Sequence, residues 1–140
     1  MEASVVWKKK GLSFSGTADT SGFTLPLGAD PKVGGENDGF RPSELILVGL
    51  AGCTAMDVIS ILAKKRMQIT AFEVKASGER ASTDPKGFIS FTVDYIMTGK
   101  DIDAAAVERA VELSETKYCT VMNTLRPAAP ITRKITIKEG

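Results

Sequence analysis

The segment from Pro42 to Arg66 constrains the fold more than any other part of the sequence. Pro42 suits the first turn of a helix, Glu44 suits its positive N-terminus, and the basic residues from Lys64 onward suit its negative C-terminus. Between these ends, apolar side chains point in every direction around a helix of about 24 residues. Such a helix should be buried on most of its faces, and a single small domain can hardly surround it.

A strip of small residues on the same helix would let another backbone approach closely. It consists of Gly49, Gly52 and Cys53, and it predicts that a second subunit covers part of the helix. The uncharged apolar stretch begins at Leu45 and is broken by Asp57, short of the roughly 20 residues that a membrane span needs. We therefore expect a buried helix and no association with a membrane.

The rest of the chain alternates between strand and helix patterns. Three short strands are predicted before the helix, within Glu2–Lys9, around Phe14 and around Phe23. After it come an antiparallel hairpin, a helix capped by Asp103, a short helix over Cys119–Leu125, and a last strand. The predicted order βββ-α-ββ-αα-β is that of an α+β protein.

Size and charge exclude several classes of function. A chain of 140 residues suits a single domain spanning residues 1–140. Its 18 Lys and Arg against 17 Asp and Glu leave no excess charge to attract nucleic acid. Because the chain has no histidine, it cannot build a Ser-His-Asp triad, a histidine general base or a histidine-ligated metal site. The N-terminus lacks the features of a secretory signal, so we expect a cytoplasmic protein.

Cys53 and Cys119 are the candidates for chemistry. They are far apart in the sequence, which excludes a CxxC motif and a cysteine-only zinc site within one chain. Cys53 lies in mid-helix among small apolar residues, where a cysteine is more often a packing residue. Its activation would need a cation from elsewhere in the chain. The candidates are Arg41, Lys32 and the early lysines, and Arg41 is preferred because a guanidinium stays charged. Cys119 precedes a helix start, which would favour its thiolate; a second core cysteine is the alternative.

Two carboxylates bear on Cys53. Asp57 lies one turn further along the same helix face and would oppose ionisation of Cys53 unless it is paired. Glu44 lies roughly 13 Å from Cys53 along the helix axis and on the opposite face, so it cannot reach Cys53 of its own chain. It either reaches Cys53 of a partner or complements the helix N-terminus.

Three strings resemble the OsmC/Ohr family of osmotically inducible and organic hydroperoxide resistance proteins. Arg41–Leu47 and Gly52–Val58 are similar to its central helix, with the Pro-x-Glu-Leu and Cys-Thr-Ala-x-Asp patterns typical of the YhfA-like branch. Lys117–Val121 brings Cys119 to the position of the family's second cysteine. The resemblance implies an OsmC-like fold with a long buried central helix, in an intertwined homodimer with active sites at the interface.

The resemblance also implies thiol-dependent reduction of organic hydroperoxides. Cys53 would be the peroxidatic nucleophile and Cys119 the resolving cysteine, with Arg41 and Glu44 completing the site. Arg41 is chosen by elimination, because no arginine precedes it. A dithiol, such as a lipoyl group on a protein, would reduce the resulting disulfide, and no metal or organic cofactor is implied.

Two other functions stay open. The protein could be a non-catalytic OsmC-like dimer that binds a small hydrophobic ligand. Ser43 favours this alternative slightly, because the family's peroxidase branches usually carry glutamate there. The second possibility is a thiol redox sensor in which oxidation of Cys53 changes a partner interaction.

Overall fold

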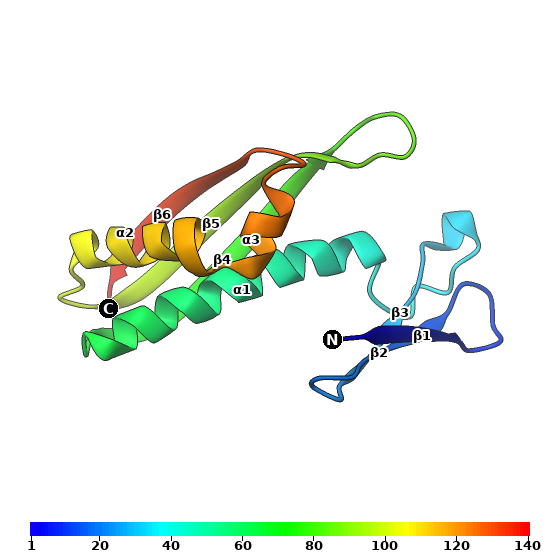
Figure 1. The fold of residues 1–140 in the computed structure, drawn as a ribbon, viewed down its shortest axis with the longest axis horizontal. Coiled ribbons are helices and arrows are strands. Elements are labelled where there is room, and N and C mark those ends of the chain that lie inside the picture. The colour runs from blue at the N-terminus through cyan, green and yellow to red at the C-terminus, as the bar shows by residue number, and fades with distance from the viewer. The chain divides into compact units, whose positions relative to one another are not determined.

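The observed elements follow the predicted order (Figure 1). The computed structural model describes all 140 residues. Its elements are β1 (Ala3–Trp7), β2 (Phe14–Ala18), β3 (Thr24–Leu27), α1 (Pro42–Lys64), β4 (Gln68–Arg80), β5 (Phe88–Lys100), α2 (Ala104–Leu113), α3 (Thr120–Leu125) and β6 (Ile131–Glu139). A 3-10 turn at Pro31–Val33 and a π-helical turn at Ser114–Tyr118 were not predicted. The α+β class and the order of its elements are confirmed.

The chain divides into two compact units, and the boundary falls within α1. The first unit spans Met1–Ile46 and the second spans Leu47–Gly140. All of the fully buried apolar side chains belong to the second unit, from Leu50 onward. A single domain over residues 1–140 stays a prediction.

The first unit is a small antiparallel sheet in the order β1-β2-β3. The loop after β3 returns to it through hydrogen bonds from Gly28 N–H to the Phe40 carbonyl and from Phe40 N–H to the Pro26 carbonyl. Gly39 is required at this close approach, because a Cβ there would lie 2.6 Å from the Pro26 carbonyl carbon. Large apolar side chains of this sheet remain exposed, among them Val5, Val6, Trp7 and Phe23. The unit therefore lacks a core of its own.

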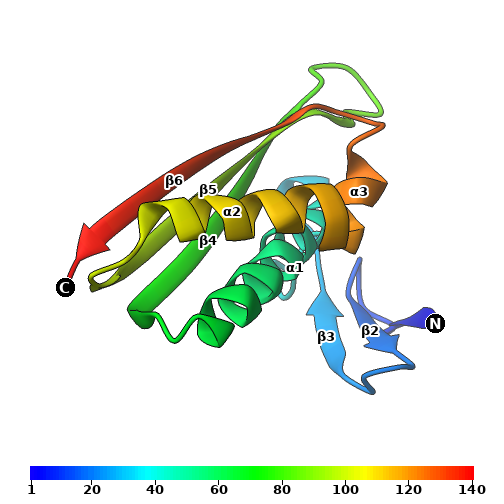
Figure 2. The ribbon, with the colours of Figure 1, turned by 60° about the vertical axis from the view of Figure 1, so that its left-hand side comes forward.

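The second unit is a three-stranded sheet covered on one face by helices. Strands β4 and β5 form the predicted antiparallel hairpin, and β6 joins β5 in parallel after the α2–α3 crossover. Helices α1 and α2 lie on the same side of this sheet (Figure 2). Alternate residues of β5 face them and are buried, namely Phe91, Val93, Tyr95 and Met97. This layer is the core against which both cysteines pack.

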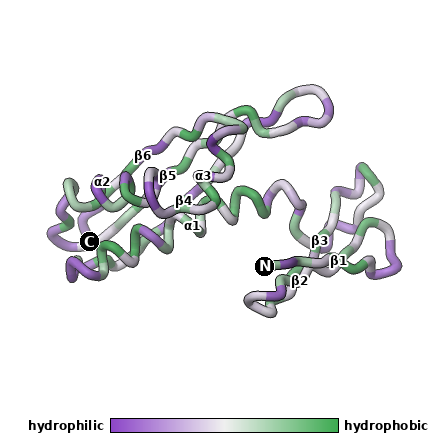
Figure 3. The backbone as a smooth tube through the Cα atoms, viewed as in Figure 1, coloured by the Kyte–Doolittle hydropathy of each residue, from purple (hydrophilic) through white to green (hydrophobic).

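Helix α1 buries a single stripe of its surface within the chain. Leu50, Thr54, Val58 and Leu62 recur every fourth residue and are fully buried. Fully burying an aliphatic side chain of this size contributes roughly 1.5–3 kcal/mol. Other apolar side chains of the helix stay exposed, including Val48, Met56 and Ile59, and hydrophobic residues recur along its whole length (Figure 3). The expected burial on most faces is therefore not met within one chain.

The length of the apolar segment was underestimated from the sequence. Helix α1 has 23 residues and a mean hydropathy of 2.2 in its most apolar window, so length and composition alone would let it cross a membrane. Asp57 interrupts the apolar run within the helix, and its carboxylate accepts a hydrogen bond from the Ser114 hydroxyl. Core helices of soluble proteins also meet these two criteria, and the buried stripe of α1 belongs to the core of the second unit.

Candidate functional site

The two cysteines lie side by side in the second unit. Cys53 is on α1 and is partly buried, whereas Cys119, just before α3, has no exposed surface. Cys53 packs against the core that contains Cys119, and the Cys53 thiol lies close enough to raise the pKa of Cys119. The fold thus brings together two thiols that are far apart in the sequence.

Short hydrogen bonds fix Cys119 in place. Its sulfur caps α3 by accepting a hydrogen bond from Met122 N–H at 3.3 Å. Its backbone N–H donates to the Ser114 carbonyl at 2.8 Å, which closes the π-helical turn. Its carbonyl accepts a bond of 2.8 Å from the Asn123 side-chain amide. Side chain and backbone of Cys119 are therefore both held.

Burial decides the protonation state of Cys119. It raises the pKa of this thiol to about 12; the Met122 N–H lowers the pKa in part, and the Cys53 thiol and the Asp57 charge raise it further. The expectation that the start of the following helix favours a Cys119 thiolate was therefore wrong. The cap is present, but the cost of ionising a buried thiol exceeds its effect. Reduced Cys119 is neutral at pH 7.

The free energy of unfolding should fall as the pH rises above about 9. The ordinary thiol pKa is 9.0 and the folded pKa of Cys119 is about 12, so the unfolded chain loses this proton first and is favoured increasingly across that range. Burial also raises the pKa of Tyr95 above its ordinary 10.0, with the same sign. Urea unfolding at about pH 8 and about pH 10.5 measures the loss. Cys119→Ala should lose less stability than the wild type between these values, and equal losses would contradict the assignment.

A chain of buried hydroxyl groups runs beside the cysteines. Tyr95 Oη lies 2.8 Å from Thr54 Oγ1, which lies 2.7 Å from Ser114 Oγ. Ser114 Oγ–H donates to Asp57 Oδ2 at 2.8 Å. Thr54, Tyr95 and Ser114 are each at most 1% exposed. This network was not predicted from the sequence, although each member is a polar residue within an otherwise apolar stripe, which was the available signal.

Asp57 is paired by a hydroxyl group and not by a cation. Its only side-chain hydrogen bond comes from Ser114, and it forms no salt bridge with a lysine or arginine. A pocket of about 180 Å³ opens beside it, lined by Asp57, Ser60, Ile61, Lys64 and Tyr118. The outer end of the hydroxyl chain therefore reaches a small surface pocket.

Arg41 and Glu44 belong to the first unit, where they close the start of α1. Glu44 Oε1 accepts a 2.7 Å hydrogen bond from Arg41 N–H, and the Arg41 guanidinium donates to the Gly39 carbonyl and to Asn37 Oδ1. Within the chain Glu44 thus satisfies the helix N-terminus, one of its two interpretations. Both residues also line an open hollow of about 430 Å³ in this unit. An approach to the Cys53 of a partner stays a prediction.

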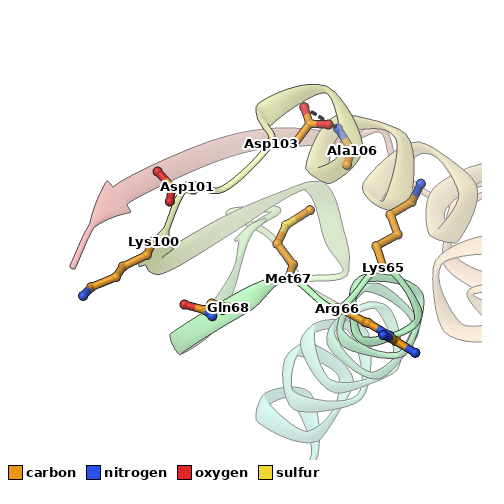
Figure 4. Close-up of a pocket in the computed structure, with 8 residues that line it drawn as sticks. All are labelled: Lys65, Arg66, Met67, Gln68, Lys100, Asp101, Asp103 and Ala106. Carbon is orange, nitrogen blue, oxygen red and sulfur yellow. Dashed lines mark hydrogen bonds between the residues drawn. The ribbon is translucent and has the colours of Figure 1, made fainter.

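A larger hollow of about 530 Å³ lies in another part of the second unit. Figure 4 shows it between the end of α1, the start of β4, the end of β5 and the start of α2. It contains no cysteine, and its Asp103 is occupied in capping α2, as predicted. No cluster of three or more acidic or cysteine side chains is arranged to hold a metal ion. The thiol pair is therefore the candidate site.

Comparisons with known proteins agree with this fold. The family model described as OsmC-like protein matches residues 35–134. The chain belongs to the OsmC-like family. Protein YhfA of Escherichia coli K12 is 39% identical to this OsmC-like chain over 132 residues, 94% of each protein.

Solved structures extend the likeness over nearly the whole chain. A hypothetical protein from Aquifex aeolicus VF5 superposes with a TM-score of 0.84 at 25% identity, covering 99% of this chain and 96% of that one. An organic hydroperoxide resistance protein OsmC from Legionella pneumophila gives a TM-score of 0.71 at 16% identity, covering 96% and 95%. The OsmC-like fold and the family resemblance are confirmed.

Proposed function

We propose that the protein is a thiol-dependent peroxidase that reduces organic hydroperoxides to alcohols and so contributes to defence against oxidative stress. The observation that carries the proposal is that the Cys53 and Cys119 thiols, far apart in the sequence, lie close together in the same core. Membership of the OsmC-like family supports it, since the Legionella pneumophila neighbour is named an organic hydroperoxide resistance protein.

Burial supports the division of roles between the two cysteines. A peroxidatic thiol has to be ionised and reachable by the peroxide. Cys119 has no exposed surface and a pKa of about 12, whereas Cys53 is partly exposed. Cys53 is therefore the better nucleophile for the peroxide. Cys119 lies close enough to attack the oxidised Cys53 and form a disulfide with it.

The proposed cycle balances with a hydroperoxide and a dithiol alone. The Cys53 thiolate attacks one peroxide oxygen, the O–O bond breaks, and the alkoxide takes a proton and leaves as an alcohol, with Cys53 as a sulfenic acid. The Cys119 sulfur then attacks the Cys53 sulfur, and water leaves as the disulfide forms. A dithiol, such as a lipoyl group on a protein, reduces the disulfide by exchange and supplies the two electrons.

A homodimer belongs to the proposal, with each chain a single domain. Apolar side chains left exposed on α1, such as Val48 and Met56, support a second copy as the cover. Across that interface Arg41 and Glu44 would approach the Cys53 of the partner, where the guanidinium would stabilise the thiolate. We also propose that the protein works in the cytoplasm, where dithiol reductants are maintained.

Peroxide consumption by the purified protein tests the proposal. With dihydrolipoamide as reductant, we expect continuous consumption of cumene hydroperoxide and slower consumption of hydrogen peroxide, because the surroundings of Cys53 are apolar. Without the dithiol, each protein chain should consume only one molecule of hydroperoxide. Consumption no faster than in a protein-free control would refute the peroxidase.

An apolar pocket in the first unit favours a second candidate function, the binding of a small hydrophobic ligand. The pocket measures about 300 Å³ and is lined mainly by small and apolar side chains, including Ala3, Gly16, Phe23, Leu25 and Leu45. A fluorescent fatty acid probe distinguishes the two functions. Saturable binding that Cys53→Ser leaves intact, in a protein without peroxide turnover, would favour the binder.

A further inference from the structure

We infer that Ser114 is a positioning residue, which holds the backbone of Cys119 against the segment of α1 that carries Cys53 so that the two sulfurs can join. The inference rests on the proposed thiol chemistry. It assigns a role to a fully buried hydroxyl group that touches neither the peroxide nor the reductant.

Ser114 connects the two cysteines through short hydrogen bonds. Its side chain bonds to Thr54 and Asp57 on α1, at 2.7 and 2.8 Å. Its own carbonyl accepts the backbone N–H of Cys119 at 2.8 Å. Because Thr54 directly follows Cys53, the path from one cysteine backbone to the other runs through Thr54 and Ser114 alone.

The direction of the hydroxyl chain follows from the carboxylate at its end. Ser114 has one hydroxyl proton, and it donates this proton to Asp57 Oδ2. The Ser114 oxygen then accepts from Thr54, and Thr54 accepts from Tyr95. Each hydroxyl donates once in the same direction, and all three are satisfied away from water. Loss of the Ser114 hydroxyl would leave Thr54 and Asp57 without this buried partner.

The turn that carries Ser114 is also held from its other side. Glu115 pairs with Arg133 of β6 at 3.0 Å, and its carbonyl accepts a hydrogen bond from Arg126. The turn itself is closed by the π-type bond from Cys119 N–H to Ser114, and single π turns are frequent at functional sites. The approach of Cys119 to α1 is therefore set by Ser114, with the rest of the turn fixed to β6 and α3.

This positioning of Cys119 by the hydrogen bonds of Ser114, called the clamp below, matters because Cys119 is a weak nucleophile. Its thiol is neutral at pH 7, so the step in which its sulfur attacks an oxidised Cys53 depends on a high effective concentration of the two groups. In that step the S–S bond forms, the bond from Cys53 sulfur to its leaving group breaks, and the Cys119 proton is released. Misplacing Cys119 should slow this step and leave the first oxidation of Cys53 unchanged.

A reaction with the aromatic disulfide DTNB tests the clamp without any peroxide. Attack of Cys53 releases one coloured thiolate and leaves a mixed disulfide; attack of Cys119 on that mixed disulfide releases a second. We expect Ser114→Ala to slow the second release by about tenfold or more with the first unchanged. The matched control is Thr116→Ala, which removes a hydroxyl from the same turn that bonds only to the Glu112 carbonyl; it should keep both rates.

Two substitutions of Asp57 separate the clamp from the charge and carry the test if Ser114→Ala does not fold. Asp57→Ala removes the acceptor of the Ser114 proton and should slow the second release. Asp57→Asn keeps an acceptor oxygen for the Ser114 proton. In this variant the second coloured thiolate should be released at least as fast as in the wild type. Wild-type second release in both Ser114→Ala and Asp57→Ala would overturn the clamp. Absence of peroxide turnover in the wild type would refute the proposed function alone, since the second release is measured without peroxide.

Discussion

Replacing Cys53 by serine should reduce hydroperoxide consumption to the rate of a protein-free control. A serine hydroxyl is not ionised at neutral pH and cannot form a sulfenic acid, so neither the attack on the O–O bond nor any later step can occur. The measurement is cumene hydroperoxide consumption with dihydrolipoamide in excess. The substitution should not unfold the protein, because Cys53 is only partly buried and the side chains are similar in size.

Cys119→Ser is the matched variant, because it removes the other thiol from the same contact. Serine at this position can still accept the hydrogen bond from Met122 N–H and is a preferred N-cap residue, so α3 should keep its start. We expect this variant to consume one equivalent of hydroperoxide and then turn over slowly, with Cys53 held as a sulfenic acid. Full turnover in Cys53→Ser with none in Cys119→Ser would reverse the two roles.

Met56→Glu should convert the proposed dimer to a monomer and remove the proposed peroxide turnover. Met56 is 72% exposed on α1, so a charge there costs the single chain little, whereas burying it in an interface would be expensive. Turnover should fall with it, because Arg41 and Glu44 could no longer approach the Cys53 of a partner. Light scattering after size-exclusion chromatography gives the mass, and circular dichroism shows whether the fold is kept.

Thr92→Glu serves as the control for the added charge, since Thr92 is exposed on β5 in the second unit, away from α1. It should leave the mass and the turnover unchanged. A wild-type protein that is already monomeric, or a Met56→Glu protein that stays dimeric with wild-type turnover, would contradict the interface on α1.

Local signals made much of the fold predictable. Pro42 and Lys64 are the first and last residues of α1, as their helix-terminus preferences indicate, and Asp103 caps α2 through Ala105 and Ala106 N–H. The alternation in β4 and β5 indicated the hairpin because one face of the sheet is buried against helices. These features depend on residues a few positions apart, whose preferences a sequence displays directly.

Other features depend on contacts between distant segments. The buried hydroxyl network joins three separate elements, since Thr54 lies on α1, Tyr95 on β5 and Ser114 in the π-helical turn. No local sequence pattern predicts that these hydroxyl groups meet. The pKa of Cys119 was misjudged for the same reason, since the helix start is local but burial is not. The contact between Cys53 and Cys119 was expected only through the family resemblance.

The central claim is that peroxide oxidises Cys53 and Cys119 to a disulfide with each other. Mass spectrometry of the protein after one equivalent of cumene hydroperoxide, with free thiols blocked before digestion, tests it most directly. We predict that the peptides containing Cys53 and Cys119 are joined within one chain and that dihydrolipoamide separates them. Oxygen added to Cys53 while Cys119 stays a blocked free thiol, or two unmodified cysteines with the peroxide unconsumed, would contradict it.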